Sequence, residues 1–340
     1  MKVLIIKIGA IGDVITTLPV IAEVKKRYPA SHITWICGQT VLPILKTVPA
    51  VDCIVSINEA DLFSSNKLSI FKTLMIIYRK IGFSFFNIIL NYHADNRYKL
   101  ISLFTLSAQR LKLLRTTERP IPIPGRTRSD EYVRLFVQYK DNHKISEINF
   151  PKIVYEEPLF DRWLLDKTKK TVIICPGGAK NILHEQMMRR WPIEKYSNLA
   201  EVLIALNYNV VVCGAASDAW VLDHFNNIPV VNFVGELSLN QTVTLFKSAD
   251  YVVTHDSGPF HLAVMAQGPQ IIGLFGPTNP HEVIYKNNDK IHFIWGGEEL
   301  ACRPCYYGKH FARCTNNLCM QFISVNEVIS LINELTIETN

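Results

Sequence analysis

The feature that most constrains the fold is a series of short, almost wholly apolar segments separated by longer amphipathic ones. Such apolar segments are typical of strands buried on both faces, as in a parallel sheet. The alternation therefore predicts α/β units. We expect strands at residues 3–8, 33–37, 53–57, 86–91, 172–175, 210–213, 230–233, 251–254 and 271–275. We expect helices at 14–28, 67–80, 98–107, 129–140, 193–206, 238–248, 259–267 and 325–336.

The strand series restarts after a polar, charged stretch at 141–170 that contains no convincing core strand. With 340 residues, the chain is long enough for two domains of about 150–170 residues each. The helix at 325–336 could close either domain. Ligands in doubly wound sheets bind at the carboxyl ends of the strands, so we expect a cleft between the domains. The predicted division is a Rossmann-like domain at 1–150, a linker at 151–170 and a Rossmann-like domain at 171–340.

No secretory or membrane-spanning segment is visible in the sequence. The first apolar run is interrupted by Lys7 and Asp13 and lacks a small-residue cleavage site. The longest stretch without charge, 257–281, contains eight Gly or Pro residues, which excludes a simple spanning helix. We therefore expect a cytoplasmic protein. Its eight cysteines should then be reduced thiols or metal ligands rather than disulfides.

The net charge of +6 is concentrated in one part of the chain. Residues 97–144 hold eleven Lys or Arg and only four Asp or Glu. Such an excess favours an anionic partner, for example a phosphorylated lipid, a sugar acid or a nucleic acid. A solvated basic face is the commoner explanation of a charge cluster.

The first predicted strand leads into "KIGAIGDVITTLP", where Gly9 and Gly12 allow a tight turn at a helix start. The GxxG spacing differs from the dinucleotide-binding pattern GxGxxG. Asp13 occupies the position of an N-cap, which is the plainer interpretation. The alternative is a carboxylate that removes a proton from a hydroxyl.

Two further strands end in turns suited to an anion. One is followed by Gly177 and Gly178, with Lys180 and Arg189 further along, and cations beside such a turn suit a diphosphate. The other leads into "HDSGPFHLA" (255–263), whose Ser-Gly-Pro helix start offers backbone N–H groups to a phosphate. A serine hydrolase site is disfavoured here, because the GxSxG elbow is absent and residues so close in sequence rarely converge as a triad.

Four cysteines lie close together near the C-terminus: Cys302, Cys305, Cys314 and Cys319. A CxxC pair followed by a CxxxxC pair is compatible with a structural zinc site. Four reduced thiols in a loop-rich segment are the alternative, and we expect no required cofactor.

Three motifs taken together resemble one family. "IGDVITTLP", "RRWP" and "HDSGPFHLA…GLFGPTNP" follow one another in the order found in the ADP-heptose:lipopolysaccharide heptosyltransferases, glycosyltransferase family 9. The resemblance spans nearly the whole chain and implies a two-Rossmann fold of the GT-B type. It also implies an inverting, metal-independent transfer, with the acceptor bound by the first domain and the nucleotide sugar by the second.

The resemblance also implies roles for individual residues. Asp13 matches the general base of the family. The expected donor-binding residues are Arg189, Asp218, Asp256, Ser257, Gly258 and His261. Residues expected to support the loops are Gly12, Thr16, Thr17, Gly177 and Lys180. The expected acceptor-binding residues are His93, Arg97, Arg119 and Arg126. Thr16 and Arg189 depart from the His and Lys that many members have at these positions.

The predicted function is therefore transfer of heptose from ADP-heptose to the inner core of lipopolysaccharide, onto a Kdo or heptose acceptor. The partners are an ADP-sugar and a lipid A–core acceptor at the membrane surface, and the enzyme could be peripheral on the inner face of the inner membrane. The alternatives are a transferase for another nucleotide sugar and a nucleotide-sugar epimerase or hydrolase. A nucleic-acid-binding module is disfavoured by Asp13 and the diphosphate turns, so no nucleic acid partner is expected.

Overall fold

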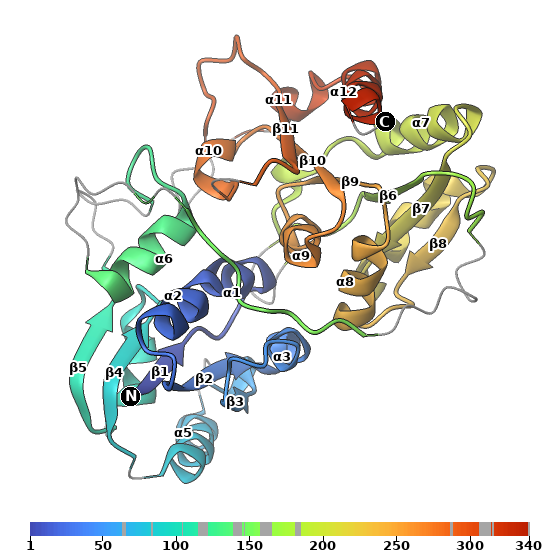
Figure 1. The fold of residues 1–340 in the computed structure, drawn as a ribbon. Coiled ribbons are helices and arrows are strands. Elements are labelled where there is room, and N and C mark those ends of the chain that lie inside the picture. Colours follow the sequence, from blue (N-terminus) through green and yellow to red (C-terminus); the bar gives the residue numbers. More distant parts are fainter. Residues whose placement is uncertain are drawn as a thin grey trace. The chain divides into compact units, whose positions relative to one another are not determined.

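The computed structural model contains two compact units, Met1–Val154 and Tyr155–Asn340 (Figure 1). The predicted linker spans this boundary, although its residues 157–164 lie outside the part of the chain that is described. Which unit holds the acceptor and which the donor stays a prediction. The structure describes residues 1–62, 66–82, 84–103, 105–114, 122–138, 145, 147–156, 165–180, 185–285, 288–305, 314 and 316–338.

The first unit contains a five-stranded parallel sheet in the order β3-β2-β1-β4-β5. Its strands are β1 (Lys2–Ile6), β2 (His32–Gly38), β3 (Cys53–Ile57), β4 (Phe86–Asn91) and β5 (Ser107–Lys112). Leu4 and Ile6 are fully buried in a core that also contains Ile77 and Ile81. Because neighbouring residues of a strand point to opposite faces, the equally buried Val3 and Ile5 face the other side of the sheet. The sheet is therefore covered on both faces.

The helices of the first unit supply these two covers. α1 (Ile11–Thr17) and α2 (Pro19–Arg27) both pack against α6 (Arg128–Val137), whereas α5 (Lys67–Ile81) packs against β3 and contributes Ile77 and Ile81. Figure 1 shows the two groups of helices on opposite sides of the sheet. The remaining helices are α3 (Leu42–Lys46), α4 (Glu59–Leu62) and the 3₁₀ helices η1 (Gln39–Val41) and η2 (Asn96–Ser102).

The second unit contains a six-stranded parallel sheet in the order β11-β10-β9-β6-β7-β8. Its strands are β6 (Thr171–Cys175), β7 (Asn209–Gly214), β8 (Val231–Val234), β9 (Tyr251–His255), β10 (Gln270–Phe275) and β11 (Ile291–Trp295). α8 (Leu239–Lys247) and α9 (Gly258–Ala266) pack together on one face (Figure 1). The other helices are α7 (Ile193–Ala205), α10 (Pro280–Val283), α11 (Leu318–Gln321), α12 (Val325–Glu338) and the 3₁₀ helices η4 (Met187–Arg189) and η5 (Ala216–Phe225).

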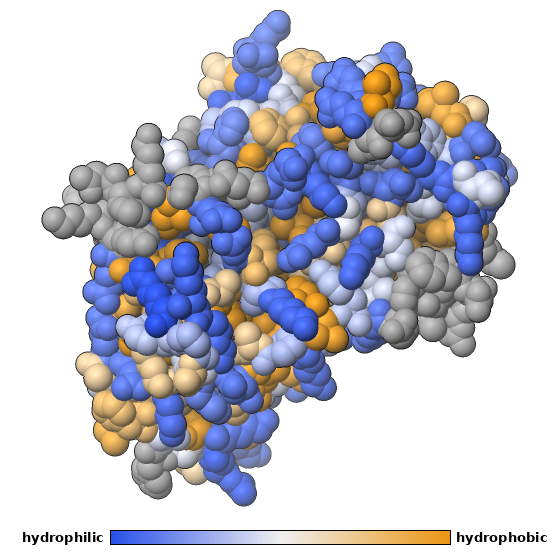
Figure 2. Space-filling view, viewed as in Figure 1, coloured by the Kyte–Doolittle hydropathy of each residue, from blue (hydrophilic) through white to orange (hydrophobic). Residues whose placement is uncertain are grey.

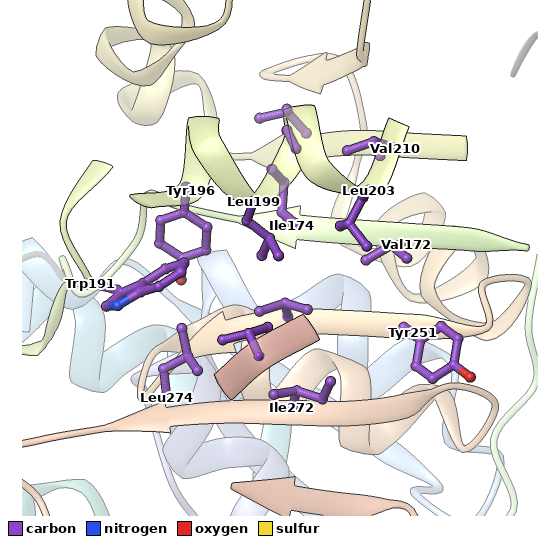
Figure 3. Packing of buried hydrophobic residues seen from close by; sticks show 14 of the residues in the cluster. Val172, Ile174, Trp191, Tyr196, Leu199, Leu203, Val210, Tyr251, Ile272 and Leu274 are labelled. Carbon is purple, nitrogen blue, oxygen red and sulfur yellow. The ribbon is translucent and has the colours of Figure 1, made fainter. Parts of the chain in front are cut away.

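The core of the second unit lies between its sheet and α7. Figure 3 shows Leu199 and Leu203 of α7 directed at Val172 and Ile174 of β6. The C-terminal helix α12 packs on α7 and adds buried residues to this same core. The C-terminal helix, which the sequence allowed to close either domain, therefore belongs to the core of the second unit.

Three sequence-based assignments are wrong. The helix expected at 14–28 is two helices, since α2 begins at Pro19, which has no N–H group to continue the preceding helix. The helix expected at 98–107 is the short η2 followed by β5. β5 is an edge strand of mostly polar sequence, SAQRLK, so it lacks the apolar pattern of the central strands. The third error is the omission of the edge strand β11, whose sequence IHFIW is apolar apart from one histidine.

Within the described ranges, no helix combines the length and the apolar character that crossing a membrane requires.

Candidate functional site

Each sheet has one point where the strand order reverses, and polar residues gather at both. In the first unit the reversal lies between β1 and β4, and in the second it lies between β6 and β9. At such a point the loops that leave two neighbouring strands diverge, which opens a crevice at their carboxyl ends. The loops that follow β1, β4, β6 and β9 are therefore the natural place for ligands in each unit.

The first site centres on Asp13, whose carboxylate lies between two cations. Lys7 Nζ is 3.1 Å from Asp13 Oδ2, and Arg128 NH1 is 3.2 Å from Asp13 Oδ1. Lys7 follows β1 directly and is almost fully buried, whereas Asp13 and Arg128 stay about one-third exposed. Lys7 also donates to the backbone oxygen of Tyr92 and to the hydroxyl of Tyr132, both at 3.4 Å. Each oxygen of the carboxylate therefore faces one cation, while about one-third of the aspartate side chain stays exposed.

Asp13 is held as an anion by these neighbours. Burial alone acts to raise the pKa of Asp13, but the positive charges of Lys7 and Arg128 outweigh it and lower the pKa well below its usual range. Burial likewise acts to lower the pKa of Lys7, and Asp13 reverses that shift. The prediction that Asp13 is an N-cap is wrong, because the N-cap of α1 is Ala10. Asp13 lies in the first turn, where its charge is free to face other groups.

The loop after β1 is braced from neighbouring strands. The backbone N–H of Ile8 donates to His93 Nε2 at 2.9 Å, and Trp35 Nε1 donates to the backbone oxygen of Lys7 at 3.0 Å. His93 also stacks on Tyr98 with ring centroids 3.6 Å apart, and burial lowers the pKa of His93 well below its usual value. A neutral imidazole is therefore built into the loop, and acceptor binding by His93 stays a prediction.

A second carboxylate lies beside the same loop. A methyl group at Gly9 would lie 3.3 Å from Oε2 of Glu59, which stands at the start of α4. Burial raises the pKa of Glu59, while the pKa of Asp13 is lowered. Two carboxyl groups whose pKa values are shifted in opposite directions are suited to different roles in proton transfer.

In the second unit, Asp218 ties two loops together. Its Oδ1 accepts from the backbone N–H of Gly178 and its Oδ2 from that of Ala215, both at 2.9 Å. Gly177 is required for this contact, since a methyl group there would come within 2.4 Å of Asp218 Cγ. Gly178 has a φ of 82°, which favours glycine, and a methyl group there would lie 3.2 Å from Ser257 Oγ. The turns after β6 and β9 are therefore in contact.

Arg189 and Asp256 form an ion pair at this edge of the sheet. Arg189 NH1 is 3.2 Å from Asp256 Oδ2, with one-fifth of the arginine side chain exposed and the aspartate nearly buried. The adjacent Ser257 is the N-cap of α9, and Gly258 is the first helical residue. The first N–H groups of a helix have no partner within the helix and attract anions. A cation and a helix start are thus combined next to a glycine turn.

Tyr196 and His255 form a buried polar pair next to Asp256. The hydroxyl of Tyr196 and Nδ1 of His255 share a hydrogen bond at 3.1 Å, and Trp191 packs edge-on against Tyr196, as Figure 3 shows. Burial, followed by the positive charge of Arg190, lowers the pKa of His255 to about 3, so the ring is neutral. Arg190 donates to the backbone oxygen of Gly178 through two nitrogens. The sequence "RRWP" thus places one arginine toward Asp256 and the other on the glycine turn.

Other predicted site residues have their own partners. His261 Nδ1 is 3.0 Å from the hydroxyl of Tyr285. Arg126 is nearly buried and pairs with Glu131 at 3.3 Å. Thr16 and Thr17 donate to the backbone oxygens of Gly12 and Asp13, one turn earlier in the helix. Lys180 is exposed and lies in an antiparallel bridge with Glu185. Arg119 and the side chain of Arg97 lie outside the described part of the chain.

The four clustered cysteines carry free thiols. Cys302 and Cys314 are exposed, Cys305 is buried and Cys319 is half-buried. Among the residues that the structure describes, no three His, Cys, Asp or Glu side chains are grouped closely enough to hold a metal ion. Burial raises the pKa of Cys319 to about 11.

Sequence reasoning missed Lys7 and Glu59 and did not rank Arg128. The signal for Lys7 was a lone lysine at the end of an otherwise apolar strand run. Arg128 belonged to the basic stretch 97–144, and only its position at the start of α6 brings it to Asp13. Glu59 has no signal in the local sequence, because its place depends on β3 lying two strands away from β1.

Comparison with known proteins points to one family. Lipopolysaccharide core heptosyltransferase OpsX of Haemophilus influenzae is 25% identical over 86% of this chain and 84% of its own. Lipooligosaccharide heptosyltransferase 2 of Haemophilus ducreyi is 24% identical over 82% of this chain and 84% of its own. The structure of ADP-heptose LPS heptosyltransferase II of Escherichia coli has a TM-score of 0.76 at 19% identity and covers 100% of this chain and 99% of its own.

The match to a family model gives the family directly. Residues 117–309, more than half of the chain, match the model for glycosyltransferase family 9 (heptosyltransferase). The predicted fold class, two Rossmann-like α/β domains of the GT-B type, is confirmed by the sheets and by the structural similarity. The family resemblance seen in the three sequence motifs is confirmed as well. The chain therefore belongs to glycosyltransferase family 9 and is a glycosyltransferase.

Proposed function

We propose that the protein transfers heptose from ADP-heptose onto the inner core of lipopolysaccharide, with inversion at the anomeric carbon and without a metal ion. The observation that carries the proposal is the donor-type site in the second unit. There, Arg189 lies beside Asp256 at 3.2 Å, next to the start of α9 and the Gly177–Gly178 turn. Relatives named for lipopolysaccharide heptosyl transfer, aligned over most of the chain, support this choice of donor and acceptor.

In this proposal the second unit stabilises the leaving diphosphate. The N–H groups at the start of α9, beside Ser257 and Gly258, bind phosphate oxygens, and Arg189 neutralises the charge that grows as ADP leaves. Asp256 orients Arg189. Asp218 is nearly buried and acts through the two loops that it joins. His261 and Lys180 are the remaining candidates for donor contacts.

In the first unit, Asp13 receives the proton of the attacking hydroxyl. A carboxylate with a lowered pKa is a weak base in the resting enzyme, but it is ionised at any working pH. The proton becomes acidic only as the hydroxyl bonds to the anomeric carbon, so the transfer is late. One attack from the face opposite the leaving group inverts that carbon. His93 and Arg126 shape the acceptor loops through Ile8 and Glu131, and Arg97 and Arg119 stay predicted acceptor contacts.

The test is ADP release from ADP-heptose, with and without an acceptor that bears Kdo. Release that depends on the acceptor supports the transferase. Release without acceptor points to an epimerase or hydrolase. Turnover only with another nucleotide sugar would contradict heptose as the transferred sugar and leave the fold assignment unchanged. Purified enzyme retaining full rate after chelation and dialysis supports the metal-independent reaction.

The base is tested by Asp13→Asn, with Asp61→Asn on α4 as the matched control. Asp13→Asn is expected to lower kcat by about 10²–10⁴-fold, the usual range for a general base, whereas Asp61→Asn stays near wild type. Glu59→Gln is the decisive third variant. If Asp13→Asn retains most activity while Glu59→Gln loses it, the base is Glu59 and not Asp13.

A further inference from the structure

Helix α5 is apolar on its outer face as well as on its inner one. Thr73, Ile77 and Ile81 are buried against the sheet. On the opposite side, Leu68, Phe71, Met75 and Ile76 are 44–59% exposed. A surface helix of a globular protein normally turns polar residues to solvent. An exposed group of large apolar residues therefore marks an interaction surface.

This surface extends from α5 onto neighbouring elements. η2 packs against α5, and the hydroxyl of Tyr78 donates to the backbone oxygen of Leu100 at 3.0 Å. The backbone N–H of Phe86 donates to the oxygen of Leu106, which brings the starts of β4 and β5 together. Figure 2 shows hydrophobic residues gathered at this end of the first unit. We call this the docking face, and its 43–61% exposed apolar residues are Leu68, Phe71, Met75, Ile76, Phe85, Leu100, Leu103 and Leu106.

The charged side chains of α5 are all positive: Lys67, Lys72, Arg79 and Lys80. The acids of the adjoining α4, Glu59 and Asp61, lie on a separate helix. Lys72 and Arg79 are exposed on α5 and lie on the same side of the helix as Leu68 and Met75, as their spacing of three to four residues requires. The helix itself has no acidic residue. Apolar side chains and cations are thus interleaved on one face.

This combination selects the partner. A second copy of the chain would bring two cationic faces together, which is unfavourable in a self-complementary contact. An anionic bilayer suits both features, because apolar side chains enter the boundary between headgroups and acyl chains while Lys and Arg reach the lipid phosphates. We propose that the docking face binds the first unit to the surface of an anionic lipid membrane, with α5 lying in the plane of the interface. This inference rests on the proposed function in one respect: a lipid-linked acceptor is the reason why the enzyme would bind a membrane.

The test is flotation of the full-length protein with vesicles of phosphatidylcholine alone or mixed with phosphatidylglycerol. Wild type is expected to float with the mixed vesicles, less so at high salt, and not with phosphatidylcholine alone. Lys72→Gln and Arg79→Gln should each weaken binding about fivefold, the effect expected of one cation at an anionic surface. Phe71→Ser combined with Met75→Ser should weaken it about tenfold or more.

Matched controls separate the docking face from general charge and apolarity. Lys26→Gln with Lys46→Gln removes two exposed cations elsewhere on the first unit, and Leu206→Ser with Ile337→Ser removes two exposed apolar residues of the second. Both control pairs should float like wild type. Circular dichroism melts, and ADP release with a detergent-solubilised acceptor, should be unchanged in all variants, which excludes unfolding as the cause.

Three results would overturn the proposal. The first is wild type that does not float with anionic vesicles, and the second is α5 variants that float as well as their controls. The third is a wild-type dimer that Phe71→Ser with Met75→Ser converts to a monomer without changing flotation, since the face would then join two copies. Flotation needs no turnover, so a protein that floats as expected but never releases ADP contradicts the proposed function alone.

Discussion

Lys7 shows how one buried charge sets the state of its neighbour. A lysine that is almost fully buried is tolerated only with a partner, because leaving it unpaired costs several kcal/mol (about 3–5). Asp13 is that partner, and Lys7 in return is a main reason why the pKa of Asp13 is lowered. In the proposed function, Lys7 is a positioning residue that acts through the carboxylate of Asp13.

Lys7→Met is expected to move the acid limb of the kcat/KM profile to higher pH. Met fills a similar volume without the charge, so burial, which acts to raise the pKa of Asp13, is opposed mainly by Arg128. The measurement is kcat/KM against pH for wild type, Lys7→Met and the exposed control Lys26→Met. An acid limb that is the same in all three would mean that Asp13 does not limit the rate in acid.

The buried His255 makes the stability of the second unit depend on pH. Its pKa is about 3 in the folded protein and about 6.5 in an unfolded chain, so the unfolded chain binds the proton more readily. Acid therefore favours unfolding of the second unit, by about 1.4 kcal/mol per pH unit between pH 6 and pH 4. His255→Asn should remove this share of the slope. Urea unfolding followed by hydrogen exchange in β6 and β9 would measure it, and equal slopes for the two proteins would contradict the assignment.

At the scale of elements, the glycine turn after β6 is where backbone and side chain fit most closely. Asp218 needs the space above Gly177 to reach the N–H groups of Gly178 and Ala215. The start of α9 is different, because nothing lies within 4 Å of a methyl group placed at Gly258. A side chain at position 177 would therefore clash with Asp218, whereas one at position 258 has space.

Gly177→Ala is expected to raise the KM for the donor at least tenfold and to lower the free energy of unfolding by about 1–3 kcal/mol, since Asp218 must move. Gly258→Ala is the matched control and should keep wild-type stability. Donor kinetics and urea unfolding of both variants check this. A Gly177→Ala enzyme as stable and as tight for donor as Gly258→Ala would show that the Asp218 contact does not support the turn.

For the whole molecule, the main feature is that each unit has its own core. Leu203 lies in the core of the second unit and Ile77 in that of the first, both fully buried. Leu203→Ala should lower the free energy of unfolding of the second unit by about 2–5 kcal/mol and leave the first nearly unchanged, and Ile77→Ala should do the reverse. Hydrogen exchange at moderate urea, resolved by peptide, measures both units at once. Equal acceleration of both units in either variant would show that they unfold together.

The sequence by itself determined the fold class and the region of each proposed site. Central strands such as β1 and β9 are continuous apolar runs, and the turns after them are marked by Gly12, Gly177 and Gly258, so local pattern was sufficient to find them. The edge strand β5 was missed because its sequence SAQRLK is mostly polar, and its side chains are partly exposed. β11 was missed although four of its five residues are apolar.

Only the tertiary structure decided which partners each polar side chain has. Asp13 lies between Lys7 and Arg128, Asp218 accepts backbone N–H groups from two loops, and His93 accepts the N–H of Ile8. The physical reason is that apolar periodicity is a local property of the chain, whereas the charge and hydrogen bonding of a side chain depend on groups brought together from distant positions by the order of the strands.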